Sequence, residues 1–174
     1  MRFFSVLVQR CAMLCISALC IAGAATAQPL PNPTGEVILT VAGPISGQNS
    51  GDLAVFDQAM LAEIGTKTIE TSTIWTEGLR SFTGTPMAAL LQRLGITSGT
   101  IQASAINDYT VEIPVADLLE GHALLAWHLD GQPMSVRQKG PLWIVYPYDS
   151  DNRFQSEIYF SRSIWQLARL TLVP

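Results

Sequence analysis

Short runs in which apolar and polar residues alternate follow one another along most of the chain. Alternation over residues 37–41 and a Thr- and Ile-rich run over 67–73 each predict a strand. Asp130-Gly131 separates two apolar runs and is typical of a tight turn. Further strands are predicted at 100–105, 110–113, 124–128 and 142–146.

Two segments have helical spacing. The clearer one covers residues 86–94, with Thr85 at the expected N-cap, Pro86 at the first helical position and Gly95 just past the end. A shorter helix is predicted over 57–64. The helix over 86–94 should pack on a sheet through one apolar face, made of Met87, Leu90, Leu91 and Leu94.

The last segment, 163–173, fits two interpretations. Ile164, Leu167 and Ala168 have helical spacing, whereas the run 170–173 looks like a strand. Many short strands with two or three brief helices are typical of an α+β domain that is mostly β. Because the sequence contains no internal repeat or low-complexity block, we predict one domain over 36–174.

Residues 1–27 have the pattern of a secretory signal peptide. Arginines give a basic start, an apolar stretch of roughly a dozen residues follows, and the small residues at 25–27 form a cleavage site. We therefore expect cleavage after Ala27 and a periplasmic mature chain. Residues 28–35 are rich in proline and predict a stiff linker.

Charge and cysteine usage exclude several classes of function. The chain carries a net charge of −4, and the predicted signal peptide holds two arginines and no acid, so the mature chain is more acidic still. Such a surface disfavours nucleic acid as a partner. All three cysteines lie within 1–27, which leaves no disulfide, thiolate ligand or cysteine nucleophile. His122 and His128 are the only histidines, too few for a histidine-rich metal site.

Aromatic and polar residues stand together at four places near the ends of predicted elements. Loops at strand ends commonly carry binding groups on a rigid scaffold. A flat heteroaromatic ligand needs ring faces for stacking and acceptors for the amino groups on its edge. The candidates are Trp75 with Glu77, Asn107 with Asp108 and Tyr109, Arg137 with Lys139, and Arg162 with Trp165.

Each group also has a purely structural interpretation. Trp143 and Trp165 lie in apolar strings, which favours places in the core. Asn107 and Asp108 suit a hairpin turn, and Glu77 suits a solvated loop. The two cations of the third group could solvate a loop or bind an anionic or carbonyl-bearing ligand.

The order of the motifs carries further information. Residues 68–78 end a strand-like run in Trp-Thr-Glu-Gly, and residues 82–91 read aromatic-x-Gly-x-Pro before a helix. This order resembles the molybdopterin-binding domain of sulfite oxidase-like oxidoreductases, in which a cysteine-bearing strand leads to an aromatic-x-Gly-x-Pro-Leu helix. The resemblance implies the α+β fold of that family and a pterin-sized pocket. It continues through 107–114, 124–126, 130–134 and 139–147.

Two positions depart from the family pattern. The metal-ligating cysteine of the family should fall near Ser72, where the sequence reads Thr-Ser-Thr. A hydroxyl cannot replace a soft thiolate, so we expect neither molybdenum nor a catalytic residue. The family usually has an arginine that meets the cofactor phosphate, and here Trp143 takes its place. An aromatic ring there suits a free, unphosphorylated pterin better than molybdopterin.

A subgroup of the family carries the variant runs seen here at 107–109, 139–143 and 162–167. These runs resemble those of a subgroup of small periplasmic proteins. Members of that subgroup are similar to pterin-binding regulators, which work with membrane-bound sensor enzymes of cyclic-di-GMP signalling. The resemblance implies a non-catalytic pterin-binding subunit that relays pterin status to a membrane-anchored partner, such as a diguanylate cyclase/phosphodiesterase or a histidine kinase. The alternatives are a molybdopterin-dependent oxidoreductase subunit and an interaction module without a ligand.

In this interpretation the candidate residues have separate roles. Trp75 stacks on the pterin, and Asp108 or Glu77 accepts hydrogen bonds from its amino and ring N–H edge. Groups for the carbonyl and side-chain ends complete the predicted site, which then also contains Asn107, Tyr109, Arg137, Lys139 and Arg162.

Overall fold

The computed structural model describes residues 29–174, and the predicted signal peptide lies outside these residues. Two five-stranded sheets make up the framework. In the first sheet the strand order is β2-β1-β10-β5-β6, and β1 pairs with β10 in parallel while the other neighbours are antiparallel. The strands are β1 (Leu39–Ala42), β2 (Ala54–Phe56), β5 (Thr100–Ala105), β6 (Thr110–Pro114) and β10 (Leu167–Val173).

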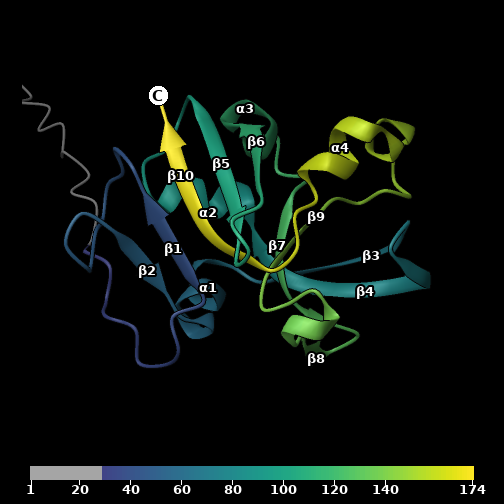
Figure 1. Ribbon diagram of the computed structural model, residues 1–174, viewed down its shortest axis with the longest axis horizontal. Coiled ribbons are helices and arrows are strands. Elements are labelled where there is room, and N and C mark those ends of the chain that lie inside the picture. Colours follow the sequence, from purple (N-terminus) through teal and green to yellow (C-terminus); the bar gives the residue numbers. More distant parts are fainter. Residues whose placement is uncertain (1–28) are drawn as a thin grey trace, which may run out of the picture.

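The second sheet is antiparallel and contains the longest strand. Its order is β3-β4-β7-β8, with β9 paired to β7. Figure 1 shows the β3–β4 hairpin extending away from the first sheet. The strands are β3 (Lys67–Thr73), β4 (Thr76–Pro86), β7 (Leu124–Leu129), β8 (Gln132–Pro133) and β9 (Trp143–Val145).

Short helices cover the sheets and connect their strands. α2 contacts α1, α3 and β4, and the four residues of its predicted apolar face are fully buried. No helix within residues 29–174 combines the length and the hydropathy needed to cross a bilayer. The helices are α1 (Gln58–Ile64), α2 (Met87–Arg93), α3 (Val115–Leu119) and α4 (Glu157–Arg162), with 3-10 turns η1 (Val136–Gln138) and η2 (Asn152–Gln155).

The predicted α+β, mostly β fold is confirmed, and the differences have local causes. Thr85 was expected to cap α2, but Pro86 is the N-cap and the buried Thr85 hydroxyl donates to the Leu61 carbonyl at 2.7 Å. The ambiguous segment forms a strand from Leu167 because it fills the gap between β1 and β5. The residues after Trp75, expected to form a loop, begin β4.

The segment predicted as a linker lies against the domain. Leu30 is buried, and the backbone N–H groups of Thr34 and Gly35 each donate to Asp57 Oδ2 at 2.8 Å. Asp57 is also the N-cap of α1, and its Oδ1 accepts from the Met60 N–H at 2.9 Å. One carboxylate therefore holds both the start of a helix and the N-terminal segment.

Replacing Asp57 by asparagine should lower the free energy of unfolding by about 1–2 kcal/mol at neutral pH. The amide keeps an acceptor oxygen but loses the charge that strengthens the hydrogen bonds. N–H donors, first that of Met60 and then those of Gly35 and Thr34, hold the pKa of the Asp57 carboxyl below its ordinary value. Its stabilisation is therefore present above the unfolded-state pKa of about 3.9 and is lost as the pH falls through the lowered folded-state pKa.

Urea unfolding of the wild type and of Asp57→Asn across the acid range measures this effect. The difference in free energy between the two proteins should be constant from neutral pH down to about pH 5 and should shrink below about pH 4. A difference that does not change with pH would contradict the assignment of the carboxylate charge to this role.

Candidate functional site

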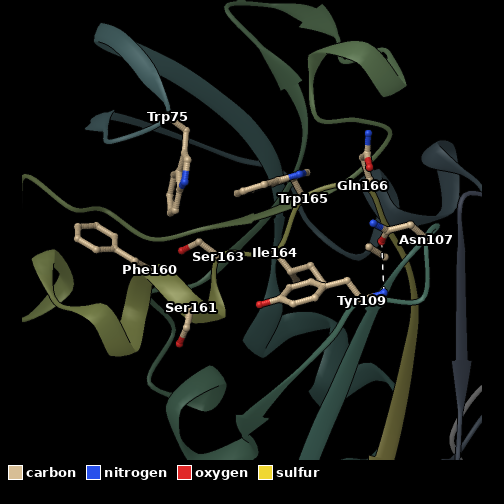
Figure 2. A pocket seen from close by; sticks show the side chains of 10 residues that line it. Trp75, Asn107, Tyr109, Phe160, Ser161, Ser163, Ile164, Trp165 and Gln166 are labelled. Atoms are coloured by element: carbon tan, nitrogen blue, oxygen red, sulfur yellow. Dashed lines mark hydrogen bonds between the residues drawn. The ribbon is translucent and has the colours of Figure 1, made fainter.

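A pocket of about 400 Å³ lies where loops of the two sheets meet (Figure 2). The turn of the β3–β4 hairpin, the β5–β6 turn, the end of α4 and the segment that leads into β10 all contribute to its wall. The lining residues are Trp75, Ala105, Asn107, Tyr109, Phe160, Ser161, Ser163, Ile164, Trp165 and Gln166.

Trp75 occupies the two-residue turn between β3 and β4 and is the centre of an aromatic cluster. Its backbone N–H donates to Thr73 Oγ1 at 3.0 Å, which fixes the turn. The indole makes edge-to-face contacts with rings on three other segments, at centroid separations of 5.6 to 6.1 Å. Packing of this kind keeps an aromatic wall in one orientation. The contacted rings are those of Trp143, Tyr148, Phe160 and Trp165.

The two tryptophans that were expected in the core differ in their surroundings. Trp143 is fully buried, as expected, and its Nε1–H donates to the Ser163 carbonyl at 3.2 Å. For Trp165 the expectation is wrong, because its side chain is 36% exposed and lines the pocket. The Lys139 ammonium lies 4.6 Å from the centroid of the Trp165 ring, so a cation stands beside this wall.

Gln166 connects three of the loops around the pocket. Its N–H donates to the Lys139 carbonyl and its own carbonyl accepts from Ile106, both at 2.9 Å, and its side chain donates to the Val136 carbonyl at 2.8 Å. Gln166, Lys139 and Asp108 all have positive φ, at 53°, 73° and 64°. Left-handed backbone is uncommon at non-glycine residues; here it lets these loops turn beside the pocket, and it also occurs at Asp130, which does not line the pocket.

The predicted site residues divide into two groups. Trp75, Asn107 and Tyr109 come together in the pocket, and Asn107 Oδ1 accepts from the Tyr109 N–H at 3.2 Å. Lys139 stands beside the pocket, on the ring of Trp165. The structure does not place the remaining candidates among the lining residues, and these are Glu77, Asp108, Arg137 and Arg162.

Each residue outside the pocket has another environment. Glu77 is exposed on β4, and Arg137 is exposed in η1. The Asp108 side chain is 87% exposed and lies 3.4 Å from Arg169. Neither Asp108 nor Glu77 is among the residues that line this pocket, so their acceptor role stays a prediction. The Asn107-Asp108 turn that the sequence suggested is present between β5 and β6.

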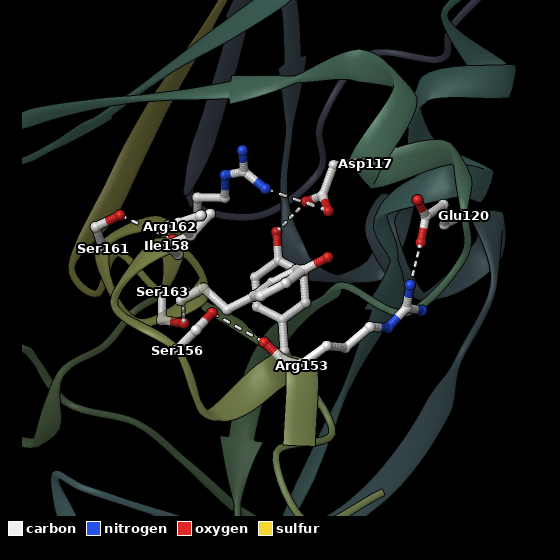
Figure 3. A network of polar contacts seen from close by, with 10 residues as sticks. Asp117, Glu120, Arg153, Ser156, Ile158, Ser161, Arg162 and Ser163 are labelled. Carbon is white, nitrogen blue, oxygen red and sulfur yellow. Dashed lines mark hydrogen bonds and ion pairs between the residues drawn. The ribbon is translucent and has the colours of Figure 1, made fainter. Parts of the chain in front are cut away.

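Arg162 belongs to a polar network that holds α4 on α3 (Figure 3). Its guanidinium lies 3.3 Å from Asp117 Oδ1, and Asp117 Oδ2 accepts from the Tyr146 hydroxyl at 2.7 Å. Burial, and then the neighbouring Asp117 charge, raise the pKa of Tyr146 well above its ordinary value, so the phenol remains a donor. Arg162 thus helps to position α4, the helix that carries Phe160.

Sequence reasoning missed the pocket residues contributed by α4 and the segment after it. No helix was predicted there, because α4 has only six residues and no buried face that would produce a periodic pattern. The one available signal was Tyr159-Phe160 beside Arg162, an aromatic pair outside any predicted element. The missed lining residues are Ala105, Phe160, Ser161, Ser163, Ile164 and Gln166.

Ser72, at the place expected for the family's cysteine, is bound to a carboxylate. Its N–H donates to Asp149 Oδ2 at 2.5 Å and its hydroxyl to Asp149 Oδ1 at 2.6 Å. These two bonds, the backbone one first, hold the pKa of the Asp149 carboxyl below its usual value. A hydroxyl committed to a carboxylate is a poor substitute for a soft thiolate, so the donors here do not fit a thiolate-bound molybdenum. Within residues 29–174, no three His, Cys, Asp or Glu side chains gather so that they could hold a metal ion.

Comparison with known proteins shows the family and the fold of this chain. Residues 61–152 match the family described as "Oxidoreductase molybdopterin binding domain". The fold is similar to that of the sulfane dehydrogenase SoxCD from Paracoccus pantotrophus, with a TM-score of 0.53 and 16% sequence identity. The match covers 77% of this chain and 37% of the SoxCD chain, so this chain spans well under two thirds of that protein. No curated protein matches the sequence significantly.

Proposed function

The chain belongs to the oxidoreductase molybdopterin binding domain family, and from this premise we propose that it is a non-catalytic, pterin-binding protein of that fold. The pterin replaces the metal-bound cofactor in this proposal. One observation carries it: a pocket walled by aromatic rings and supplied with amide and hydroxyl groups, in a fold whose family is described by pterin-type cofactor binding.

The pocket has the size and chemistry that a pterin requires. Its volume of about 400 Å³ is within the usual range for small-ligand sites. Trp75, Trp165 and Phe160 offer ring faces and edges, and such contacts are favourable for a flat heteroaromatic ring. Asn107 and Gln166 offer amide donors and acceptors for the carbonyl and nitrogen atoms of the ring.

Two replacements support a pterin without molybdenum or phosphate. The Ser72 hydroxyl is held by Asp149 and is not free to act as a metal ligand. Trp143, at the position where the resemblance implies a phosphate-binding arginine, is fully buried and donates to a backbone carbonyl. A buried indole offers no positive charge to a phosphate group, so the unphosphorylated ring is the better fit.

We also propose a periplasmic location and a membrane-anchored signalling partner, such as a diguanylate cyclase/phosphodiesterase or a histidine kinase. The basic and apolar pattern of residues 1–27 supports export. Exposed apolar side chains around the pocket support a partner that covers its opening and so responds to occupancy. These side chains are Ile106, Tyr109, Val136 and Trp165.

Calorimetric titration of the purified mature protein with 6-hydroxymethylpterin and with biopterin, each oxidised and reduced, tests the proposal. We expect micromolar or tighter binding of at least one form, which corresponds to about 8 kcal/mol and requires several contacts at once. Mass spectrometry of small molecules released from protein purified from its native compartment should then find a pterin without phosphate.

Elemental analysis distinguishes the alternatives. About one molybdenum and one phosphorus per chain, retained on dialysis, would contradict the proposal. That result would support the alternative, a molybdopterin-dependent oxidoreductase subunit. No binding of any pterin, with no released small molecule, would leave the ligand-free interaction module.

A further inference from the structure

Two side-chain amides line the same end of the pocket. Asn107 belongs to the β5–β6 turn, and Gln166 immediately precedes β10. The Ile106 N–H donates to the Gln166 carbonyl at 2.9 Å, so the turn and the segment before β10 are held together at this point. Figure 2 shows the two amide groups next to each other, on the side of the pocket opposite Trp75. We call Asn107 and Gln166 the amide pair.

A backbone partner fixes the orientation of each amide. Asn107 Oδ1 accepts from the Tyr109 N–H at 3.2 Å, and Gln166 Nε2 donates to the Val136 carbonyl at 2.8 Å. Turning either amide over would break its bond, because a carbonyl cannot donate and an NH2 group cannot accept. The hydrogen bonds within residues 29–174 thus leave Asn107 Nδ2 as an open donor and Gln166 Oε1 as an open acceptor.

The serines of the pocket differ from the amide pair in this respect. The hydroxyls of Ser161 and Ser163 donate to the carbonyls of Ile158 and Tyr159 at 2.8 Å and 2.7 Å. A hydroxyl has one proton, so these side chains can accept from a ligand but have no second proton to donate. The amide pair therefore offers what the serines lack, a donor and an acceptor together, each in a fixed orientation.

A cyclic amide, or lactam, presents the complementary edge. Its N–H and its C=O lie side by side and point in nearly the same direction. In a pterin, N3–H and the C4 carbonyl form such an edge, so N3–H can donate to Gln166 Oε1 while the C4 carbonyl accepts from Asn107 Nδ2. Because backbone bonds hold both amides before the ligand arrives, little side-chain ordering is needed on binding.

From these observations we propose that Asn107 and Gln166 determine specificity for the lactam edge of the ligand, N3–H beside the C4 carbonyl. The inference rests on the proposed pterin-binding function and deepens it by naming the edge that the protein recognises. With that edge on the amide pair, the rest of the ring lies along Trp165 and Tyr109 and is directed towards Trp75 (Figure 2).

Three ligands that differ only on the pyrimidine ring test the assignment. 6-Hydroxymethyllumazine keeps N3–H and the C4 carbonyl and lacks only the 2-amino group, so its affinity should lie within about threefold of that of 6-hydroxymethylpterin. 2,4-Diamino-6-hydroxymethylpteridine has an acceptor at N3 and a donor at C4, which reverses the lactam edge. It should bind the wild type at least about tenfold more weakly than the pterin in calorimetric titration at pH 7.

Asn107→Asp tests the donor of the amide pair. A carboxylate oxygen still accepts from the Tyr109 N–H, so the turn is kept, but the group that faced the C4 carbonyl becomes an acceptor. The preference for the pterin over the diaminopteridine should fall below about threefold, because the carboxylate repels the C4 carbonyl and accepts from the 4-amino group.

The matched control is Asn152→Asp, which makes the same chemical change at an exposed residue of η2 that does not line the pocket. We expect this control to keep the wild-type preference, and thermal unfolding should show both variants folded. Loss of the preference in the control as well would assign the effect to added negative charge and would overturn the inference.

The remaining outcomes separate the inference from the function on which it rests. If the wild type binds the pterin and the diaminopteridine equally, or if Asn107→Asp keeps the full preference, the inference is overturned while pterin binding stands. Lumazine binding as weak as that of the diaminopteridine would mean that the 2-amino group is recognised instead, which also overturns it. If none of the three ligands binds, the proposed function fails and the inference fails with it. Should Asn107→Asp not fold, the wild-type order of affinities decides.

Discussion

Replacing Trp75 by alanine should weaken pterin binding by about tenfold to seventyfold. A lost aromatic stack costs about 0.5–1.5 kcal/mol beyond area burial, and uncovering about 50 Å² of apolar ligand surface adds about 1 kcal/mol. The variant also removes the ring that holds Phe160 and Trp165 in place, which raises the loss towards the upper limit. Calorimetric titration with 6-hydroxymethylpterin measures the change.

Two further variants separate stacking from general damage. Trp75→Phe keeps a ring in the turn and should lose less than about tenfold in affinity. Glu77→Ala changes an exposed residue two positions along the same hairpin and should bind like the wild type. If Trp75→Ala and Glu77→Ala bind equally well, the pterin does not contact the tip of this hairpin.

Replacing Asp117 by alanine should lower the free energy of unfolding by about 2–4 kcal/mol. The Asp117 side chain is 9% exposed and accepts from the buried Tyr146 hydroxyl, while Arg162, its ion-pair partner, is 19% exposed. Removing one partner of a buried pair leaves a charge and a hydroxyl without a partner, and that loss is larger than the value of the pair itself. Urea unfolding at neutral pH measures the change.

Glu120→Ala is the matched control, because Glu120, at the C-terminal end of α3, pairs with Arg153 of the neighbouring turn η2 (Figure 3). The Glu120 and Arg153 side chains are 47% and 42% exposed, and an exposed ion pair contributes at most about 1 kcal/mol. Equal losses from the two variants would mean that burial does not distinguish the pairs. Because α4 carries Phe160, Asp117→Ala should also weaken pterin binding, whereas Glu120→Ala should not.

The parts of the fold that the sequence predicted are those governed by local periodicity. The helix over 86–94 was predicted because its four apolar positions all face the core, and they are buried. Strand β2 was missed because it has only three residues, too few to display alternation. The segment 163–173 could not be decided locally, since its strand conformation depends on β1 and β5, which are distant in the sequence.

The part of the candidate site that was predicted also depends on local sequence patterns. Trp75, Asn107 and Tyr109 lie at turns that local sequence marks, and the structure brings them together. Phe160 lies on a six-residue helix, and Gln166 has a positive φ. Neither feature leaves a pattern that the sequence alone reveals. The contact between Ser72 and Asp149 joins residues 77 positions apart, so only the tertiary structure could show it.

The central position of β10 in the first sheet has a consequence for the order of folding. Hairpins β1–β2 and β5–β6 can form early from neighbouring residues, but each keeps an open edge until β10 is synthesised and inserted between them. Trp165 and Gln166 immediately precede β10, so the pocket wall is placed by the same late event. If the proposed ligand fills this pocket, it binds only the state in which β10 has been inserted, so occupancy would shift the folding equilibrium towards the completed sheet.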